Sequence, residues 1–288
     1  MGKWKKVPLK NLTTLMVDGD WVESKDQSTE GIRLVQTGNI GEGEYLDKPK
    51  RAKYISEKTF IYLSCTEVFG GDVLVSRLPS PVGRACILPQ SNTRMVTAVD
   101  CTVIRFDKAR CLSKYFVYFS MTILYQYEVA KHIAGSTRVR ISRKNLETVR
   151  VPLPSLEIQE QIAQTLDTTS ELLSMRQQQL AELDNLIKST FYYMFGDPVG
   201  NEKGWKVIQL ADCLSIVGGY AFKSTDFSNE GIPIIKIGNI NSGTFHDKGI
   251  SFWNYDKKFD KYLLYPNDIV ISLTGTVGKD DYANVCIL

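Results

Sequence analysis

An internal repeat at an offset of about 200 residues limits the folds that this chain can adopt. Residues 30–40 match residues 230–240, with six of the eleven positions identical, and both segments contain Gly-Asn-Ile at the same place. A tryptophan opens a second matched pair, residues 4–9 with residues 205–210. Since the repeating unit is far longer than a solenoid repeat, the pattern indicates a duplicated domain.

The later matches define the extent of the second copy. The paired segments are Gly71–Ser76 with Asn267–Ser272, Pro81–Gly83 with Thr276–Gly278, and Cys86–Leu88 with Cys286–Leu288. The sequence contains no counterpart of the residues that follow Leu88 in the first copy. We therefore expect residues 205–288 to be an incomplete domain, shortened either naturally or artificially.

Residues 155–195 differ from both copies and predict one long helix. Ser155 follows Pro154 as an N-cap, and Gly and Pro are then absent until Gly196. Apolar residues recur every seven positions, which is a heptad pattern. Such a helix would be about 60 Å long at 1.5 Å per residue, too long to be buried in one domain, so most of it needs a partner helix. The predicted helix-pairing residues are Leu166, Leu173, Leu180, Leu183, Ile187 and Met194.

The first copy reads as a mixed α+β domain over residues 1–154. Strand-like runs alternate irregularly with one aromatic-rich helical run over 113–130. The expected strands cover residues 34–40, 73–76, 85–88, 97–106 and 148–153. The predicted organisation is therefore a domain over 1–154, a coiled-coil helix over 155–195, and a partial second copy over 196–288.

Composition excludes several classes of protein. Hydrophobic residues make up 43% of the 288 residues and charged residues 23%, the balance of a soluble globular protein. No run approaches 18 apolar residues, and no signal peptide is present, so we expect no membrane segment. Six cysteines without a CxxC motif fit neither a zinc ribbon nor a disulfide scaffold, and we expect a reducing cytoplasm.

Charge is unevenly distributed along the chain. Residues 1–154 contain 24 Lys and Arg against 15 Asp and Glu, a net charge of +9. Residues 155–195 carry a net charge of −4, and residues 196–288 a net charge of −2. A basic domain of this kind is typical of proteins that bind polyanions, although a solvated basic surface would have the same charge.

Three groups of basic residues are candidates for contacts to DNA. Lysine and hydroxyl side chains suit phosphate oxygens, whereas arginine can also recognise guanine in the major groove. The first group lies in 48–53, the second flanks a Pro/Gly loop at 78–83, and the third lies in 135–144. The predicted DNA-binding residues are Lys48, Lys50, Arg51, Lys53, Arg77, Arg84, Arg94, Ser136, Thr137, Arg138, Arg140, Arg143 and Lys144.

No catalytic or metal-binding motif emerges from the sequence. Gly275–Asp280 resembles a phosphate-binding loop but has the wrong spacing and lacks the hydroxyl residue after Lys279. Glu23-Ser24-Lys25 could mimic a nuclease motif and is better explained as a solvated loop. His132 and His246 are the only histidines, so we predict no catalytic residue, no metal ligand and no cofactor.

Several of these segments together resemble the specificity subunit of Type I restriction–modification systems. The likeness covers the whole chain and is most specific where a strand and a Pro pair lead into the long helix. The segments that carry it are Trp4–Leu9, Gly38–Ile40, Gly71–Leu74, Val151–Ile162 and Phe195–Pro198.

The resemblance implies two target-recognition domains, each followed by a long helix, with the two helices packed antiparallel. Each domain would read half of a split site on double-stranded DNA. It further implies a non-catalytic subunit on which methyltransferase subunits and a restriction endonuclease/translocase subunit assemble. S-adenosylmethionine, ATP and magnesium would then belong to those partner subunits.

Two alternative functions remain open, and the sequence departs from the family pattern in one respect. The chain could be the recognition part of a single-chain restriction–modification enzyme, although Met1 directly before the domain favours a separate subunit. It could also be a coiled-coil interaction protein without DNA function, which the basic first domain argues against. Because a second long helix is missing from the sequence, we expect residues 155–195 to pair with another molecule, in a homodimer or with a methyltransferase.

Overall fold

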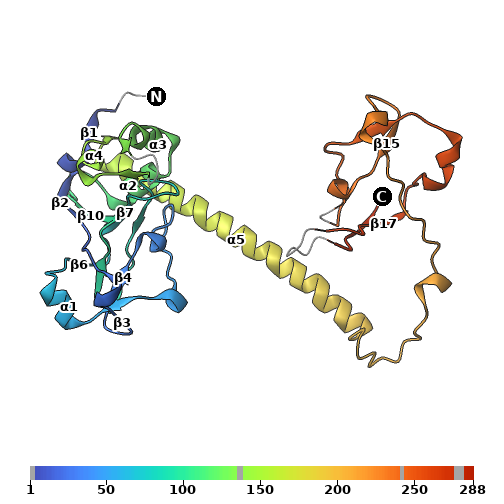
Figure 1. The fold of residues 1–288 in the computed structure, drawn as a ribbon, viewed down its shortest axis with the longest axis horizontal. Helices are drawn as coiled ribbons and strands as arrows, with labels where there is room; N and C mark the ends of the chain where they lie inside the picture. Colours follow the sequence, from blue (N-terminus) through green and yellow to red (C-terminus); the bar gives the residue numbers. More distant parts are fainter. Residues whose placement is uncertain (1–3, 135–138, 241–242, 276–281) are drawn as a thin grey trace. The chain divides into compact units, whose positions relative to one another are not determined.

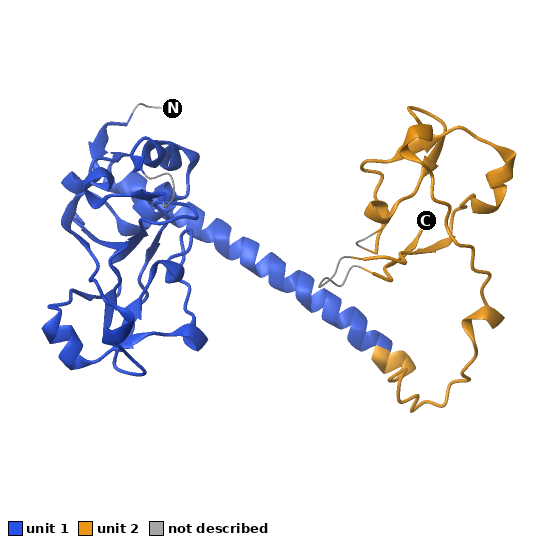
Figure 2. Ribbon diagram, viewed as in Figure 1, with its two compact units in different colours: residues 1–191 blue, residues 192–288 orange. Residues whose placement is uncertain are grey.

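The structure is a computed structural model that describes residues 4–134, 139–240, 243–275 and 282–288. The chain divides into two units, residues 1–191 and residues 192–288 (Figure 2). Both units mix strands with helices, so the predicted α+β class is confirmed.

A four-stranded antiparallel sheet forms the centre of the first unit. Its order is β2 (Thr13–Asp18), β10 (Cys101–Phe106), β7 (Val73–Ser76) and β8 (Ala85–Ile87). All four residues of β7 are buried, as are five of the six residues of β10. Both faces of this sheet are therefore covered, which explains why β7 has three successive apolar residues, Val73 to Val75, rather than an alternating pattern.

Helices cover one face of the central sheet. α2 (Ser113–Ser120) and α3 (Ile123–Ala130) place Phe116 and Tyr125 in the same buried cluster as Ile104 of β10. α4 (Arg143–Leu146) lies at the same end of the unit, where α5 begins, whereas α1 (Glu57–Tyr62) lies at the opposite end (Figure 1).

A five-stranded sheet covers the other face. Leu74 of β7 and Val103 of β10 share a buried cluster with Val35 and Val68 of this second sheet. Its strands, in spatial order, are β3 (Gln27–Ser28), β5 (Tyr54–Ile55), β4 (Ile32–Val35), β9 (Met95–Thr97) and β6 (Glu67–Val68). The β4–β9 pair is parallel and the other neighbours are antiparallel.

Two short pairs bring distant segments together. β1 (Lys6–Pro8) pairs with β13 (Arg150–Pro152), so the start of the domain lies beside the segment that leads into the long helix. β11 (Ile133–Ala134) pairs with β12 (Arg140–Ile141), and residues 135–138 between them lie outside the described residues.

The long helix α5 runs from Leu156 to Phe195 and confirms the predicted helix to within one residue. Its first turns are anchored on the domain through the buried amide of Gln159, which accepts a hydrogen bond from Leu112 N at 2.9 Å and donates to Arg110 O at 3.0 Å. Asp167 accepts from Lys114 and from Tyr118, each at 2.7 Å. Every residue from 168 to 195 is exposed, so the helix leaves the domain after three turns.

The second unit contains less regular structure. Its strands form a three-stranded sheet and a separate pair. The sheet order is β14 (Phe227–Ser228), β16 (Ser251–Trp253) and β15 (Ile232–Ile234), and the pair is β17 (Ile269–Ile271) with β18 (Val285–Ile287). Aromatic rings of Tyr220, Phe222, Trp253 and Phe259 pack together with centroids 4.6–5.6 Å apart.

Three expectations about the first domain are wrong in detail. The strand expected over 34–40 is β4, which ends at Val35 and is followed by a 3-10 helical turn over Thr37–Asn39. The single strand expected over 97–106 is two strands, β9 and β10, in different sheets, separated by a turn in which Cys101 N donates to Ala98 O at 2.9 Å. The helix expected over 113–130 is two helices, because the Thr122 side chain caps a new helix start by accepting from Tyr125 N at 3.2 Å.

Candidate nucleic-acid interface

The loop over residues 78–83 connects β7 to β8 and rests on a buried arginine. Arg84 is only 9% exposed. Its Nε donates to Ile40 O at 2.6 Å, its Nη1 to Leu78 O at 2.8 Å and Pro81 O at 3.1 Å, and its Nη2 to Thr37 O at 2.8 Å. The guanidinium thus joins two loops through backbone carbonyls, and its burial lowers the pKa of Arg84.

A hollow of about 420 Å³ opens beside this loop and brings two of the predicted groups together. Lys48, Ser80 and Arg84 line it, together with the turn 38–46, which contributes Glu42 and Glu44. Lys48 is exposed, and its Nζ donates to Gly38 O at 2.6 Å. The first basic group therefore adjoins the Pro/Gly loop, although they are about 30 residues apart in sequence.

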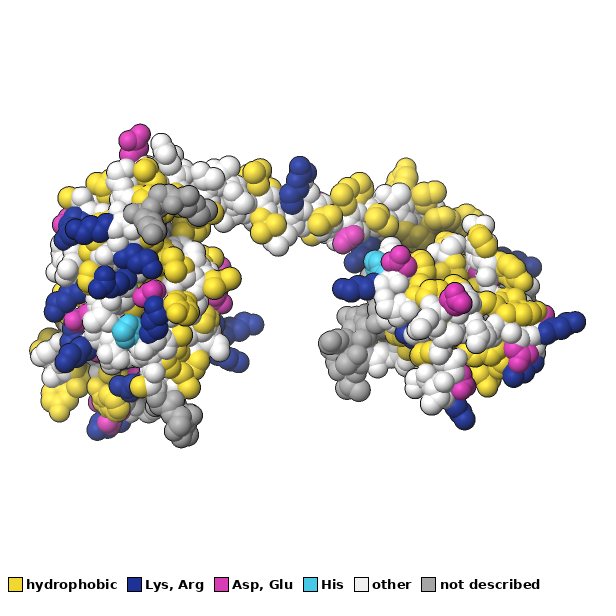
Figure 3. Space-filling view, turned by 90° about the horizontal axis from the view of Figure 1, so that it is seen from above, with side chains coloured by type: hydrophobic (Ala, Val, Ile, Leu, Met, Phe, Trp, Pro, Cys, Tyr) yellow, Lys and Arg dark blue, Asp and Glu magenta, His cyan; other side chains and the backbone are white. Residues whose placement is uncertain are grey.

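The third basic group lies at the base of the same loop. Ile141 N of β12 donates to Arg77 O at 3.2 Å, which places β12 beside the residue that starts the loop. Arg140 and Lys144 are exposed next to this contact. Ser136, Thr137 and Arg138 lie outside the described residues. In the space-filling view, Lys and Arg side chains gather on the displayed face of the first unit (Figure 3).

Two predicted surface arginines are instead structural, which corrects the sequence-based interpretation. Arg77 is only 4% exposed: its Nη2 donates to Val99 O at 2.6 Å, and its Nε lies 3.6 Å from Asp18 Oδ1. Arg84 is occupied by the four carbonyls described above. Arg77 directly follows β7, and Arg84 directly precedes β8. Because most residues of both strands are buried, both arginines lie beside the core. In this structure neither guanidinium presents a surface to DNA.

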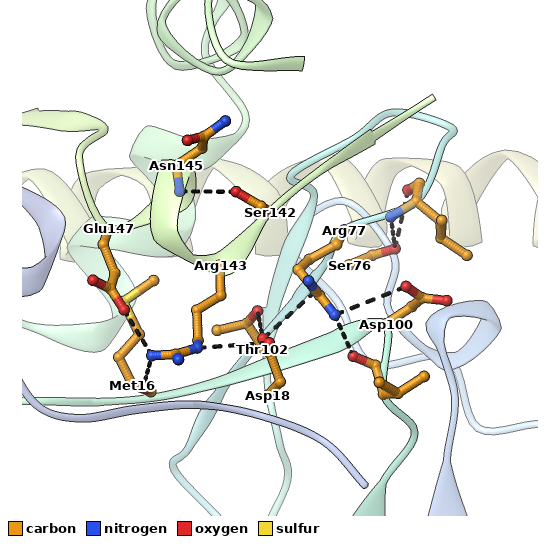
Figure 4. A network of polar contacts seen from close by, with 12 residues as sticks. Met16, Asp18, Ser76, Arg77, Asp100, Thr102, Ser142, Arg143, Asn145 and Glu147 are labelled. Carbon is orange, nitrogen blue, oxygen red and sulfur yellow. Dashed lines mark hydrogen bonds and ion pairs between the residues drawn. The ribbon is translucent and has the colours of Figure 1, made fainter. Parts of the chain in front are cut away.

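Arg143 takes part in the same polar network as Arg77 (Figure 4). Its Nη1 lies 2.7 Å from Glu147 Oε1, and its Nε lies 3.6 Å from Asp18 Oδ2. Asp18 also accepts from Thr102 at 3.0 Å, so one carboxylate connects α4 to the central sheet. Arg143 is half-buried and largely committed to this network, which leaves Arg140 and Lys144 as the exposed cations among the described residues of the third group.

Arg94 does not join the other predicted residues. Its guanidinium forms a bidentate pair with Glu67 at 2.8 and 2.9 Å and a further bond to Glu57 at 2.7 Å. These carboxylates raise the pKa of Arg94. The guanidinium also lies 4.7 Å from the centroid of the Phe60 ring. Arg94 therefore ties β9 to β6 and α1, at the end of the unit away from α5.

Sequence reasoning missed the residues that support the loops. Asn39 is buried, and its side chain accepts from Gln36 N at 3.0 Å and donates to Leu46 O at 2.9 Å. Asn239 makes the same two contacts, with Lys236 N at 2.9 Å and His246 O at 2.8 Å. The Gly-Asn pair repeated in both copies was the available signal. The asparagine of this pair supports the following turn through the same two hydrogen bonds in both copies.

The structure also corrects the register of the repeat. Gly83 N donates to Ser76 O at 2.8 Å, and the same contact in the second unit is made by Ala283 N and Ser272 O at 2.9 Å. Ala283, with a φ of 55°, therefore occupies the place of Gly83, where φ is 86°. Gly278, matched to Gly83 from sequence alone, lies outside the described residues. The next position places Asn284 where the first copy has Arg84.

The predicted helix-pairing residues lie on the exposed part of α5. Leu166 lies at the edge of the domain, while Leu173, Leu180, Leu183, Ile187 and Met194 lie beyond it. Leu180 is 64% exposed and Leu183 is 55% exposed. Hydrophobic side chains are visible along this helix in the space-filling view (Figure 3). Five of these large apolar side chains are seven residues apart and exposed within the described chain: Leu166, Leu173, Leu180, Ile187 and Met194.

The described residues include neither a candidate metal site nor a candidate membrane segment. No group of three His, Cys, Asp or Glu residues there is placed to hold a metal ion. None of the helices described is both long and apolar enough to cross a membrane.

Comparison with known proteins identifies one family. The model of the type I restriction modification DNA specificity domain matches residues 1–185 and 202–287, so each matched segment contains one copy of the repeat. The MjaVIII specificity subunit of Methanocaldococcus jannaschii is 24% identical over 191 residues, 61% of this chain and 45% of that relative. The putative MjaX specificity subunit of the same organism is 23% identical over 239 residues, 75% of this chain and 55% of that relative. The chain thus spans about half the length of these curated relatives.

One solved structure supports the fold. A chain from a study of complex assembly and conformational transition in the type I R-M system covers all of this chain, which in turn covers 72% of that one. The TM-score is 0.57 at 13% sequence identity, a likeness that concerns the fold alone.

Proposed function

Since the chain belongs to the type I restriction modification DNA specificity domain family, we propose that it recognises double-stranded DNA as the specificity subunit of a type I restriction–modification complex. The convergence of Lys48, the 78–83 loop and the Arg140–Lys144 segment on one part of a domain with net charge +9 carries this proposal. Exposed lysines there would neutralise DNA phosphates, and the loop would reach the base edges.

In this proposal the subunit directs chemistry that its partners perform. Methyltransferase subunits would supply S-adenosylmethionine binding and methyl transfer, and an endonuclease/translocase subunit would supply ATP- and magnesium-dependent steps. A bipartite site would follow from the duplication, with each copy of the repeat reading one half. The rival interpretation, a recognition part of a single-chain enzyme, predicts the same DNA contacts and differs only in covalent linkage to the catalytic domain.

Salt-dependent DNA binding tests the proposal. We would titrate the full chain with a 30-base-pair duplex at several salt concentrations, alone and with methyltransferase subunits. Replacing Lys50 and Lys144 by Ala should lower the slope of log affinity against log salt by about two units, since each lost phosphate contact removes about 0.9.

Exposed lysines outside the candidate interface provide the matched control. Lys58 and Lys108 are exposed on α1 and on the turn after β10, and their double replacement by Ala should leave the slope unchanged. Equal slopes for both double variants would remove these residues from the interface. Absence of any DNA binding, with methyltransferase present, would favour the coiled-coil interaction protein instead.

We further propose that the exposed part of α5 pairs with another helix. Burying a leucine, isoleucine or methionine side chain stabilises an assembly by about 1.5–3 kcal/mol, and five such positions lie in one heptad line. A second copy of this chain, antiparallel to the first, is the simplest partner, and a methyltransferase subunit is the alternative.

Sedimentation distinguishes the possible partners of α5. Leu173→Glu with Leu180→Glu should abolish self-association of the full chain. Gln178→Glu with Asn185→Glu adds the same charge five residues after Leu173 and Leu180, on the opposite side of the helix. This control variant should have little effect on self-association. A well-folded wild-type monomer would exclude the homodimer, and loss of methyltransferase binding in the leucine variant would then identify that subunit as the partner.

A further inference from the structure

We propose that Arg84 is a positioning residue that fixes the 78–83 loop as the specificity-determining element of the first domain. The inference rests on the proposed function in DNA recognition. It assigns base reading to the exposed tip of the loop, Pro79 and Ser80, and assigns to Arg84 the task of holding that tip in place.

The geometry around Arg84 is that of a brace rather than a surface contact. Four hydrogen bonds leave one guanidinium, two of them to the 78–83 loop and two to the segment 37–40. All four acceptors are backbone carbonyls. A planar arginine can direct several donors at fixed angles, which the single ammonium of lysine cannot do. Arg84 therefore couples two loops into one surface without touching a ligand itself.

Further contacts fix the other end of the loop. The hydroxyl of Tyr125, a fully buried residue of α3, donates to Gly83 O at 2.9 Å. The Ser76 hydroxyl donates to Leu78 O at 3.0 Å. The tip between these points remains exposed beside Lys48, across the hollow described above. A short loop held at both ends and in the middle can present a serine hydroxyl and backbone groups to a base edge reproducibly.

The two copies of the repeat provide independent support. Their frameworks agree: Asp72 accepts from Phe69 N at 2.9 Å and Asp268 from Tyr265 N at 2.7 Å, and Leu88 and Leu288 return to the same aspartates. The connection between the two strands differs. Six residues separate Ser76 from Gly83, and ten separate Ser272 from Ala283, with Asn284 in place of Arg84.

This pattern fits two domains that read different half-sites. Domains with a common task should keep a common frame, and the segments that contact different bases should differ in length and sequence. The segment after β7 differs between the copies in length and in the residue at the position of Arg84, although the contacts on either side of it are shared. The six-residue loop of the first copy depends on Arg84. The ten-residue segment of the second copy is followed by Asn284 at the equivalent position.

Selection from a randomised duplex pool tests the inference. The full chain, with methyltransferase subunits, would be incubated with duplexes containing 20 random base pairs, and bound sequences would be counted. Arg84→Lys should reduce enrichment of the wild-type sequence over the pool tenfold or more while leaving the salt slope of bulk DNA binding unchanged. A merely structural role would weaken specific and bulk binding together.

Arg105→Lys is the matched control. Arg105 also braces backbone and carboxylate groups, bonding to Asp72 at 2.7 and 3.0 Å and to Glu67 O at 3.2 Å, but it does not contact the loop. The Arg105→Lys variant should therefore enrich the wild-type sequence as strongly as the wild-type chain does. Equal enrichment in Arg84→Lys, measured on protein with a normal melting curve, would overturn the positioning role.

A second variant keeps the test decisive if Arg84→Lys fails to fold. Ser80→Lys leaves the brace intact and changes only the exposed tip, so it should alter the preferred base at one or more positions of a single half-site. An unchanged selected sequence would show that the loop does not read DNA. If the wild-type chain itself enriches no sequence, the proposed function fails, an outcome distinct from the failure of the positioning role.

Discussion

In the first unit β7 has a neighbour on each side, β10 and β8, whereas in the described part of the second unit β17 is paired with β18 alone. The registers of the two hairpins are the same, with Leu74 opposite Cys86 and Val270 opposite Cys286. Leu74 is fully buried, while Val270 is half-buried and its neighbours in β17 are exposed. The same local pairing therefore exists with and without a core around it.

The other strands of the two units show the same contrast. β14, β16 and β15 reproduce the pairing of β3, β5 and β4, since all three strands have their partners within the repeated residues. The first-copy strands β1 and β2 pair with β13 and β10, which have no counterpart in this sequence. No strand forms in residues 205–226, all of which are described. Strands whose partners lie within the repeated residues thus form in the second unit. Strands whose partners are missing do not form, because their backbone hydrogen bonds would be incomplete.

The largest expected effect is a difference in lost stability between the two hairpins, because they differ in burial. Leu74→Ala should lower the free energy of unfolding of the first unit by about 2–5 kcal/mol, because it leaves a cavity between two sheets. The equivalent Val270→Ala should cost less than about 1 kcal/mol, because its site is already half open to solvent. Hydrogen exchange of the β7 and β17 amides, followed by mass spectrometry, measures both. Equal protection losses would contradict the contrast.

A smaller effect concerns the backbone at the end of each loop. Gly83→Ala should destabilise the first unit by about 1–3 kcal/mol, because φ is positive and a Cβ would lie 3.2 Å from Tyr125 and Val129. Ala283→Gly removes the same strain and should stabilise the second hairpin or change its stability by less than about 0.5 kcal/mol. Paired denaturant titrations test the opposite signs; a loss of stability in both variants would show that these positions are not equivalent.

The smallest effect concerns the contacts that hold the start of α5, which involve α2 and have no counterpart in the second copy. The ammonium of Lys114, hydrogen-bonded at 2.7 Å, lowers the pKa of Asp167 below its ordinary value. The stabilisation is present above the unfolded-state pKa, near 4, and is lost as the pH falls through the lowered folded-state value. For this largely exposed pair it should amount to about 0.2–1 kcal/mol.

Asp167→Asn provides the measurement. The difference in unfolding free energy between wild type and variant should be constant from about pH 7 to pH 5 and shrink below about pH 4. Thr168→Asn, one residue further along the exposed helix, is a control that should show no such pH dependence. A difference that persists undiminished at low pH would mean that the negative charge of Asp167 is not the source of the stabilisation.

Periodic and repeated features were predictable from the sequence because they depend on neighbours along the chain. The heptad line and the absence of Gly and Pro predicted α5 to within one residue. The apolar runs predicted β7 and β8, and the repeat predicted a second framework with the same Gly-Asn turn. Net charge predicted a basic first domain. Each of these follows from local geometry, capping or composition.

Only the tertiary structure decided which charged and polar groups are surface and which are scaffold. Arg77 and Arg84 resemble Lys50 and Arg140 in sequence, yet the first two are buried and hydrogen-bonded to distant carbonyls, and the second two are exposed. The turn that divides 97–106 between two sheets, and the offset that places Ala283 on Gly83, likewise depend on pairing with remote strands. A buried guanidinium is stable only where the fold supplies acceptors for its donors. Those acceptors come from residues up to 47 positions away, so no local pattern in the sequence can reveal them.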